Sequence, residues 1–220
     1  MKQVVAINGS PKEQNSVSAM LINQIENILG TKTTVYQATK LIRQEGDSEV
    51  LSNILKADTL LIVFPLYVDS LPAPLVKLLT MIEQETANTK GRLPVVYAVC
   101  NCGFYEAEHN RLALNIVENF AIRSGLSWGY GIGVGCGGFL LSQSKNMTKG
   151  SVAHVYTALQ ELGSAINEGG PERDNVFITP KIPRIIYKFG GNMGWRQMAK
   201  KYGTQKSLRA KPHLESSKKG

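Results

Sequence analysis

The chain has 220 residues, 43% of them hydrophobic, which suits one domain with a sizeable core and falls short of two full domains. Its formal net charge of +8 is concentrated at one end: residues 1–180 hold 14 basic and 16 acidic residues, whereas residues 181–220 hold 11 basic residues and one acidic residue. A nearly neutral body with a basic appendage argues against a nucleic-acid-binding domain. No apolar run reaches about 18 residues, and the first residues lack the long apolar core of a secretory signal, so we expect neither a membrane span nor secretion.

The cysteines and histidines form no metal-binding pattern. The three cysteines, Cys100, Cys102 and Cys136, are odd in number and lack the spacing of a zinc site, and the three histidines are scattered. We therefore expect no metal site, and reduced thiols in a reducing compartment, the cytoplasm.

In chain order, short apolar runs alternate with longer segments of helical periodicity. The expected strands cover residues 3–8, 33–37, 58–64, 94–100 and 126–134, and the expected helices cover residues 17–29, 48–56, 75–85, 106–124 and 151–168. A continuous apolar run such as 58–64 is typical of a central strand of a parallel sheet. The alternation predicts an α/β fold, a doubly wound five-stranded parallel sheet with right-handed crossovers.

The periodicity fades at Gly169-Gly170-Pro171. We expect one domain over residues 1–170 and a basic, amphipathic C-terminal extension over residues 171–220. Three roles for the extension stay open: docking over the body or a dimer mate, contact with an anionic membrane surface, or a weakly ordered tail. Its glycines, Gly190, Gly191 and Gly194, weaken any single long helix. The residues expected to form one apolar face are Ile182, Ile185, Ile186, Phe189 and Met193, continued by Trp195, Met198 and Tyr202.

Ligands of open α/β sheets bind outside the carboxyl ends of the strands, so the loops there are the candidate site. The loop after the first strand, residues 9–16, and the helix that follows carry groups that can hold a phosphate: Ser10, Asn15, Ser16 and Ser18. The alternative is that Ser16 or Asn15 only caps the helix. Lys12 either contacts the phosphate or faces solvent.

The loop after the third strand, residues 65–74, begins and ends with proline. Tyr67 stands near the strand end, where an aromatic side chain can stack on a planar ligand. The alternative is an ordinary half-buried loop residue.

Two other signals are weaker. Gly133-x-Gly135-x-x-Gly138 has the letters of a dinucleotide fingerprint, but no clear helix is expected after it, so we interpret it as a flexible loop near the site. Cys100-x-Cys102 has the spacing of a redox pair, but Cys100 is expected to end a buried strand, which leaves at most Cys102 within reach of the site.

Two motifs at matching separation resemble the NADPH-dependent FMN reductase family. They are Gly9-Ser10-Pro11 with Asn15-Ser16 after the first strand, and Ala57-Asp58, Pro65-Leu66-Tyr67, Pro72 and Leu75-x-Lys77 around the third. The resemblance covers about residues 1–168 and implies a flavodoxin-like fold, bound FMN and a homodimer. The chain departs from the family in having Lys12 and Asn15-Ser16 where Arg and Gly-Asn-Thr are often seen.

In this family the first loop binds the FMN phosphate, and the loops after the third and fourth strands lie along the isoalloxazine. Backbone N–H groups of residues 65–68 and 102–104 are expected to hold the ring, and no catalytic side chain is implied. The expected FMN contacts are Ser10, Lys12, Asn15, Ser16, Val17, Ser18, Pro65, Leu66, Tyr67, Val68, Asn101, Cys102, Gly103 and Phe104.

We therefore expect a flavin-dependent oxidoreductase that passes a hydride from NAD(P)H through FMN to a small acceptor, such as a quinone, a flavin, a nitro or azo compound, or a metal complex. Two alternatives stay open, a flavodoxin-type electron carrier and a flavin-free binding module. The near-neutral body argues against the carrier, because flavodoxins tend to be acidic.

Overall fold

A computed structural model describes residues 2–12, 15–43, 48–169, 173–208 and 210. The chain divides into two compact units, Met1–Lys181 and Ile182–Gly220, and each is described by itself.

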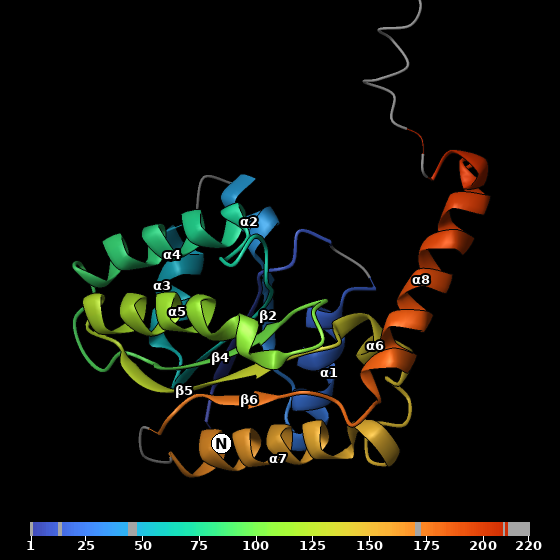
Figure 1. Cartoon of the computed structure of the whole chain (residues 1–220). Helices are drawn as coiled ribbons and strands as arrows, with labels where there is room; N and C mark the ends of the chain where they lie inside the picture. Colours follow the sequence, from blue (N-terminus) through green and yellow to red (C-terminus); the bar gives the residue numbers. More distant parts are fainter. Residues whose placement is uncertain (1, 13–14, 44–47, 170–172, 209, 211–220) are drawn as a thin grey trace, which may run out of the picture. The chain divides into compact units, whose positions relative to one another are not determined.

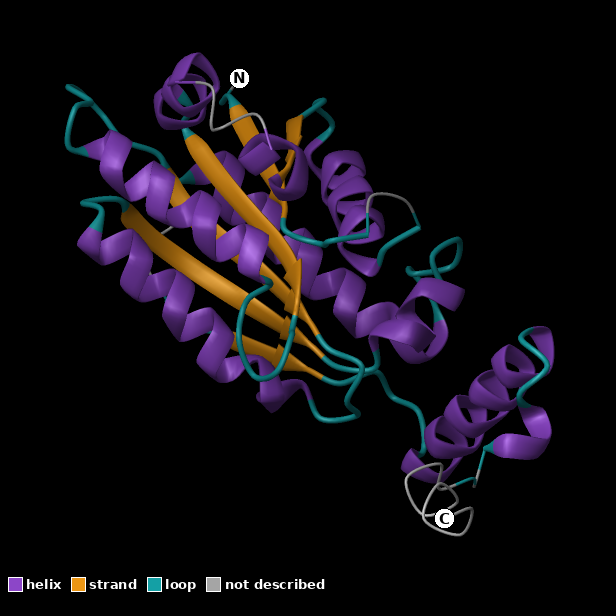
Figure 2. Ribbon diagram, turned by 90° about the horizontal axis from the view of Figure 1, so that it is seen from above, coloured by secondary structure: helices purple, strands orange, loops and turns teal. Residues whose placement is uncertain are grey.

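The first unit is built on a sheet (Figures 1 and 2). The sheet is parallel, and its strands lie in the order β2-β1-β3-β4-β5-β6. The strands are β1 Val4–Asn8, β2 Thr34–Gln37, β3 Thr59–Pro65, β4 Val95–Asn101, β5 Ser127–Val134 and β6 Val176–Ile178. The order 2-1-3-4-5 of the first five strands is that of the flavodoxin-like doubly wound fold.

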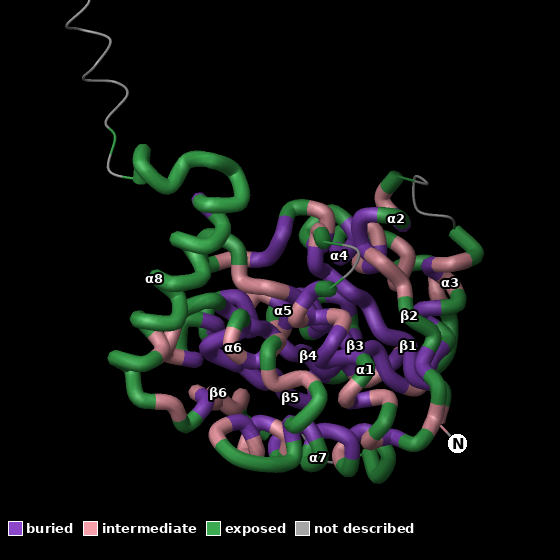
Figure 3. Tube along the Cα trace, turned by 90° about the vertical axis from the view of Figure 1, so that its right-hand side faces the viewer, coloured by how far each residue is buried: buried purple, intermediate pink, exposed green. Residues whose placement is uncertain are grey.

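Helices cover both faces of the sheet, whose strands are largely buried (Figure 3). The strand residues alternate between two buried clusters. One cluster is closed by α2 Ala38–Arg43, α3 Ser48–Lys56, α4 Ala73–Thr86 and α5 Arg111–Arg123. The other is closed by α1 Val17–Leu29, α6 Gly137–Ser142 and α7 Ala153–Glu168. Side chains of β3 show the alternation, since Leu60 and Ile62 belong to the first cluster and Leu61 and Val63 to the second.

The prediction of five strands is wrong, because β6 adds a sixth strand beside β5. Its three residues are only half-buried, which is too little pattern to detect in a sequence. The strand is held by tertiary contacts: the Asn175 side-chain oxygen accepts a hydrogen bond from Gly131 N–H at 2.6 Å, and the Arg111 guanidinium lies 4.4 Å from the Phe177 ring centre. The body therefore runs to Lys181 rather than to residue 170.

The described part of the second unit contains α8 Arg184–Lys201 and a short 3-10 turn, Gln205–Ser207. The helix begins after Pro183 and ends in a Schellman motif: Gly203, at φ 69°, donates to Lys200 O, and Thr204 N–H donates to Ala199 O at 2.9 Å. The helix is continuous through Gly190, Gly191 and Gly194, the three glycines expected to weaken it.

No helix among the described residues combines the length and the apolar character needed to cross a bilayer.

Candidate functional site

The carboxyl ends of the strands lie at the same edge of the sheet. Of the strands that follow β1 in the chain, β2 lies on one side of β1 and β3 lies on the other. This is the switch point of the topology, where α/β sheets of this order bind ligands. Asn8, Pro65, Asn101 and Val134 end the four central strands there. Pro65, Asn101 and Val134 are in register with one another, whereas Asn8 pairs with Val63, two residues before the end of β3. The structure thus places the loops that carry the predicted contacts at this edge.

The first loop is shaped by its own hydrogen bonds. Asn8 Oδ1 accepts from Ser10 N–H at 3.0 Å, Ser10 Oγ accepts from Lys12 N–H at 3.2 Å, and Lys12 Nζ donates to Asn15 O at 3.0 Å. Gly9 has no room for a side chain, because an added Cβ would lie 2.7 Å from Leu75 Cδ2. The ammonium group of Lys12 therefore stays beside the loop, within reach of an anion held there.

The N-terminus of α1 points at this loop. Ser16 is the N-cap, and its Oγ accepts from Ala19 N–H at 3.1 Å, so the capping interpretation of Ser16 is confirmed for its hydroxyl. The N–H groups of Val17 and Ser18 belong to the first turn and have no acceptor within the helix. Together with the partial positive charge of a helix N-terminus, they offer an anion-binding site.

Two polar residues that sequence reasoning did not select complete this loop. Asn8 is buried, and the register of β1 and β2 pairs it with Gln37, whose side-chain amide donates to Ser10 O. A polar residue at the end of an apolar strand was the available signal for Asn8. Gln37 carries no such signal, because it is brought here only by strand pairing.

The second loop contains a tight hairpin at its tip. Tyr67 and Ser70 exchange backbone hydrogen bonds of 2.9 and 3.0 Å, and the two residues between them have positive φ, 49° at Val68 and 56° at Asp69. Positive φ at both central positions defines a type I′ turn, which normally takes Asn-Gly. A β-branched residue such as Val68 is strained in this conformation. Val68 is also 97% exposed, so burial of its side chain does not offset the strain.

Asn101 ties the first three loops together. Its side-chain amide donates to Ser18 Oγ at 3.1 Å and to Phe64 O at 3.0 Å. Its backbone carbonyl accepts from Leu66 N–H at 2.8 Å. The residue is buried, so its side chain positions the loops. The Ser18 hydroxyl is likewise engaged with Asn101.

The third loop turns its thiol inward and its aromatic ring outward. Cys102 is buried, and Asn110 Nδ2 lies 3.4 Å from its Sγ. Burial raises the pKa of the Cys102 thiol, which keeps it protonated at neutral pH. Phe104 is half-exposed and lies 4.5 Å, ring centre to ring centre, from His109.

The fourth loop is locked to the third. Cys102 N–H donates to Val134 O, Gly137 N–H to Cys102 O and Cys136 N–H to Phe104 O, at 2.7 to 2.9 Å. A Cβ at Gly135 would lie 2.3 Å from Tyr105 O, so only glycine fits there. The prediction of a flexible loop without a helix is therefore wrong: the segment is pinned, and α6 begins at Gly137.

These bonds change what the loops offer to a ligand. The N–H groups of Leu66, Tyr67 and Cys102 donate within the protein, and Pro65 has no N–H. That the backbone of these loops holds a flavin ring stays a prediction. The second and third loops also carry exposed apolar side chains, those of Tyr67, Val68 and Phe104. A phosphate-type loop beside an apolar, aromatic rim fits FMN, which has a phosphate at one end and a flat ring at the other.

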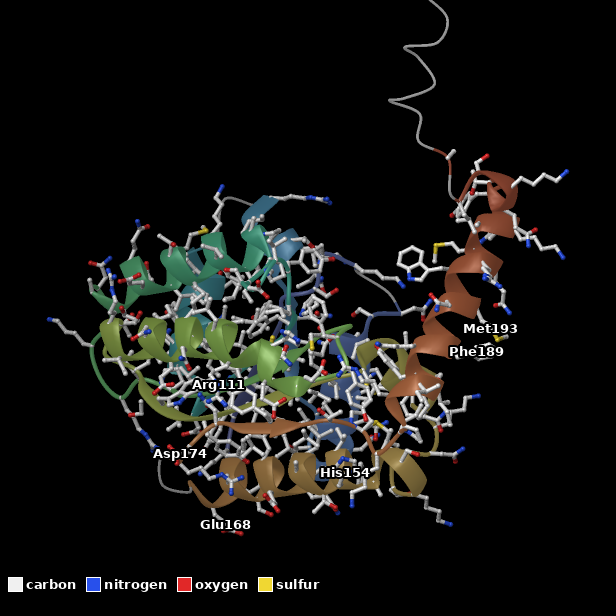
Figure 4. All side chains as sticks on the ribbon, in the orientation of Figure 1. Arg111, His154, Glu168, Asp174, Phe189 and Met193 are labelled. Atoms are coloured by element: carbon white, nitrogen blue, oxygen red, sulfur yellow. The ribbon has the colours of Figure 1, made fainter. Side chains whose placement is uncertain are left out.

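A second polar group lies at the amino end of β5, away from these loops (Figure 4). Glu118, Trp128, Arg173, Asp174 and Asn175 line a cavity there, and Figure 4 labels Asp174 of this group. Its polar groups are used within the fold, since the Arg173 guanidinium lies 3.8 Å from the Tyr130 ring centre and 3.6 Å from Glu161. We assign this group to stability. No three His, Cys, Asp or Glu side chains gather as a metal site among the residues that the structure describes.

Comparison with known proteins relates the chain to others by fold. No family model and no curated protein sequence matches it. Among solved structures, an NADH:FMN oxidoreductase in its apo form superposes with a TM-score of 0.55 at 15% identity, over 74% of this chain and 88% of that chain. An NADPH-quinone reductase from P. pentosaceus gives a TM-score of 0.51 at 17% identity, over 74% of this chain and 98% of that chain. General stress protein 14 from Treponema denticola, solved in complex with FMN, gives 0.50 at 14% identity, over 74% and 99%.

These matches and the strand order establish the class of the protein: an α/β fold of the flavodoxin-like kind. The fold implied by the sequence resemblance is thereby confirmed, with six strands in place of five. The named proteins that share it are an FMN oxidoreductase, a quinone reductase and an FMN complex, which is the kind of protein that the resemblance indicated.

Proposed function

We propose that the protein is an FMN-dependent oxidoreductase that transfers a hydride from NAD(P)H to a small acceptor, in the cytoplasm. The observation that carries the proposal is the anion-binding loop at the α1 N-terminus, adjacent at the switch point to the exposed rim of Tyr67, Val68 and Phe104. The three free, buried thiols support a reducing compartment. The fold is shared with FMN-linked reductases.

The phosphate end of FMN would be held by the first loop. The N–H groups of Val17 and Ser18 would donate to phosphate oxygens, and Lys12 Nζ would compensate their charge. Ser10 N–H is held by Asn8, so Ser10 contributes by shaping the loop. Ser16 keeps the helix start in place while its hydroxyl caps Ala19.

The ring end would lie along the second and third loops. FMN would supply the hydride chemistry when bound, so the protein needs to bind, orient and exclude water. Tyr67 and Phe104 offer aromatic surface, and Asn101 fixes the distance between their loops. In the second loop, the N–H groups of Leu66 and Tyr67 donate within the protein. The Val68 N–H group is therefore the one that would donate to the ring.

The test is the visible absorption spectrum of the purified protein, with and without added FMN, followed by NADPH or NADH without oxygen. We expect flavin bands near the usual ~450 nm that bleach with a nicotinamide. Bands that bleach only when a separate reductase is added would assign an electron carrier instead. A protein that binds no FMN even in excess would be a binding module, and the proposal would fail.

We also propose a homodimer, because Val68 and Phe104 place exposed apolar side chains around a site whose ring end needs cover from water. Light scattering of the purified protein tests this directly. A Val68→Asp variant is expected to weaken self-association without disturbing the anion loop, and a strictly monomeric wild type would refute the dimer.

A further inference from the structure

In the described part of the unit Ile182–Gly220, Ala199 is the one buried residue. Its one long helix, α8, carries large apolar side chains that its own unit leaves exposed: Ile185, Ile186, Phe189, Met193, Trp195, Met198 and Tyr202. Ile185 is 82% exposed and Trp195 is 68% exposed. An isolated helix with three internal glycines is marginally stable in water, so α8 needs a surface that covers these side chains.

The apolar residues form two stripes rather than one. At 3.6 residues per turn, the apolar residues Ile185, Ile186, Phe189 and Met193 share one side of α8. Figure 4 shows Phe189 and Met193 pointing to the same side. Trp195, Met198 and Tyr202 fall on the opposite side, so the expectation that they continue the first stripe is wrong. The switch of sides occurs across Gly190, Gly191 and Gly194.

Each stripe has basic residues opposite to it. Arg184 and Lys188 lie across the helix from the Ile185–Met193 stripe, and Arg196 and Lys200 lie across from the Trp195 stripe. With Lys201 and Lys206, the described part of this unit holds six basic residues and no acidic residue. Each half of α8 is therefore a short cationic amphipathic helix, and the two halves are out of phase by about half a turn.

Charge decides between the surfaces that can cover such a helix. A second α8 would place like charges together, and the body of the chain is nearly neutral, with 14 basic and 16 acidic residues among residues 1–180. An anionic bilayer surface offers dense negative charge, an apolar layer for the aliphatic residues and an interfacial zone that favours Trp and Tyr.

We propose that α8 binds the surface of an anionic membrane, and that it turns at the glycine cluster Gly190, Gly191 and Gly194 so that both apolar stripes enter the same bilayer. Glycine permits the turn, because it has the greatest backbone freedom of any residue. The proposal is independent of FMN binding, since it involves only the unit after Lys181.

The test uses the full-length protein and two kinds of vesicle, phosphatidylcholine alone and phosphatidylcholine mixed with phosphatidylglycerol. We expect co-sedimentation with the mixed vesicles only, weakening as salt is raised. Trp195 reports insertion by a blue shift of its fluorescence, because the other tryptophan, Trp128, is buried in the body. The matched control is Trp195→Phe, which is expected to keep co-sedimentation and lose the shift.

Two variants separate the parts of the proposal. Replacing Lys188 and Arg196 by Gln is expected to weaken binding by about fivefold for each charge removed. Replacing the three glycines by Ala, where nothing lies within 4 Å of an added Cβ, keeps α8 straight and is expected to weaken binding about tenfold or more, because one stripe then faces away from the bilayer.

Other results would contradict the membrane proposal or one of its parts. Failure to bind mixed vesicles at low salt overturns the proposal, as does equal binding to both kinds of vesicle. Self-association that depends on α8, without vesicle binding, assigns the helix to a second copy. Full binding by the alanine variant overturns the turn at the glycines.

Discussion

Ser16 serves the fold and the proposed site with different atoms. Its hydroxyl caps Ala19, while the adjacent N–H groups of Val17 and Ser18 face the loop. A substitution that keeps the cap and adds a negative charge separates these roles, because Asp caps helices as well as Ser does.

We expect Ser16→Asp to leave the melting temperature unchanged and to weaken FMN binding by about tenfold or more, since a carboxylate repels the phosphate at close range. Ser16→Ala is the opposite control, losing about 1 kcal/mol of stability with its cap while sparing the N–H groups. Thermal melts and flavin fluorescence titrations measure both. Unaltered FMN affinity in Ser16→Asp would place the phosphate elsewhere.

Val68 and Asp69 occupy a turn that suits other residues. Replacing them by Asn and Gly is expected to raise the free energy of unfolding by about 1 kcal/mol, because both replacements tolerate positive φ. Urea denaturation measures the gain. Val76→Asn is the control, an exposed valine in the ordinary helix α4, and a gain in this variant too would mean that the exposed side chain, and not the turn, is responsible.

Cys136 links stability to pH. Burial, with a smaller effect of Cys102, raises the pKa of the Cys136 thiol from 9.0 to about 11. The folded state therefore keeps a proton that the unfolded state releases, and the contribution is complete below pH 9 and lost as pH rises through about 11.

The expected result is a free energy of unfolding that falls between pH 9 and 11, less steeply in Cys136→Ser. Urea titrations at several pH values give the two slopes. The buried thiols of Cys100 and Cys102 and the hydroxyls of Tyr97 and Tyr130, whose pKa values burial also raises, leave a residual slope in the variant. Identical slopes would show that Cys136 does not titrate in this range.

At the scale of elements, sequence reasoning succeeds where the pattern is long and local. The runs that became β1, β3, β4 and β5 are mostly apolar because helices cover both faces of the sheet. The short elements β6 and α2 are set by tertiary contact and escape such reasoning. For the same reason the loops of the candidate site were located by strand ends, whereas their internal bonds, such as those of Asn101 and Cys102, were not foreseeable.

Helix glycines have opposite roles in the two units. In α7, an added Cβ at Gly163 would lie 2.5 Å from Ile28 Cγ2 of α1, whereas Gly190 in α8 has nothing within 4 Å. We expect Gly163→Ala to lower the free energy of unfolding by about 1–3 kcal/mol despite the better helix propensity of Ala. Gly190→Ala is expected to slow amide exchange in α8. A stabilised Gly163→Ala protein would mean that α1 and α7 readily move apart.

At the scale of the whole molecule, the position of the domain boundary is testable by truncation. A chain ending at Lys181 is expected to keep the melting temperature and FMN binding of the full chain, because it retains all six strands of the sheet that the structure describes. A chain ending at residue 170 loses β6, whose Ile178 carbonyl accepts from Gly135 N–H and whose neighbour Thr179 caps Ala107. We expect this shorter chain to be less stable by several kcal/mol, about one for each lost bond plus the exposed sheet face. Equal stability of the two truncations would make β6 dispensable.

The burial of all three native thiols has a practical consequence for labelling. A maleimide dye added to the folded protein meets no accessible sulfur, so a single cysteine introduced at an exposed position becomes the one reactive group. Lys206→Cys, in the turn after α8, would carry a fluorophore on the basic unit without any change to the body. The wild-type protein can therefore serve as the parent for site-specific spectroscopy, because no native cysteine has to be removed.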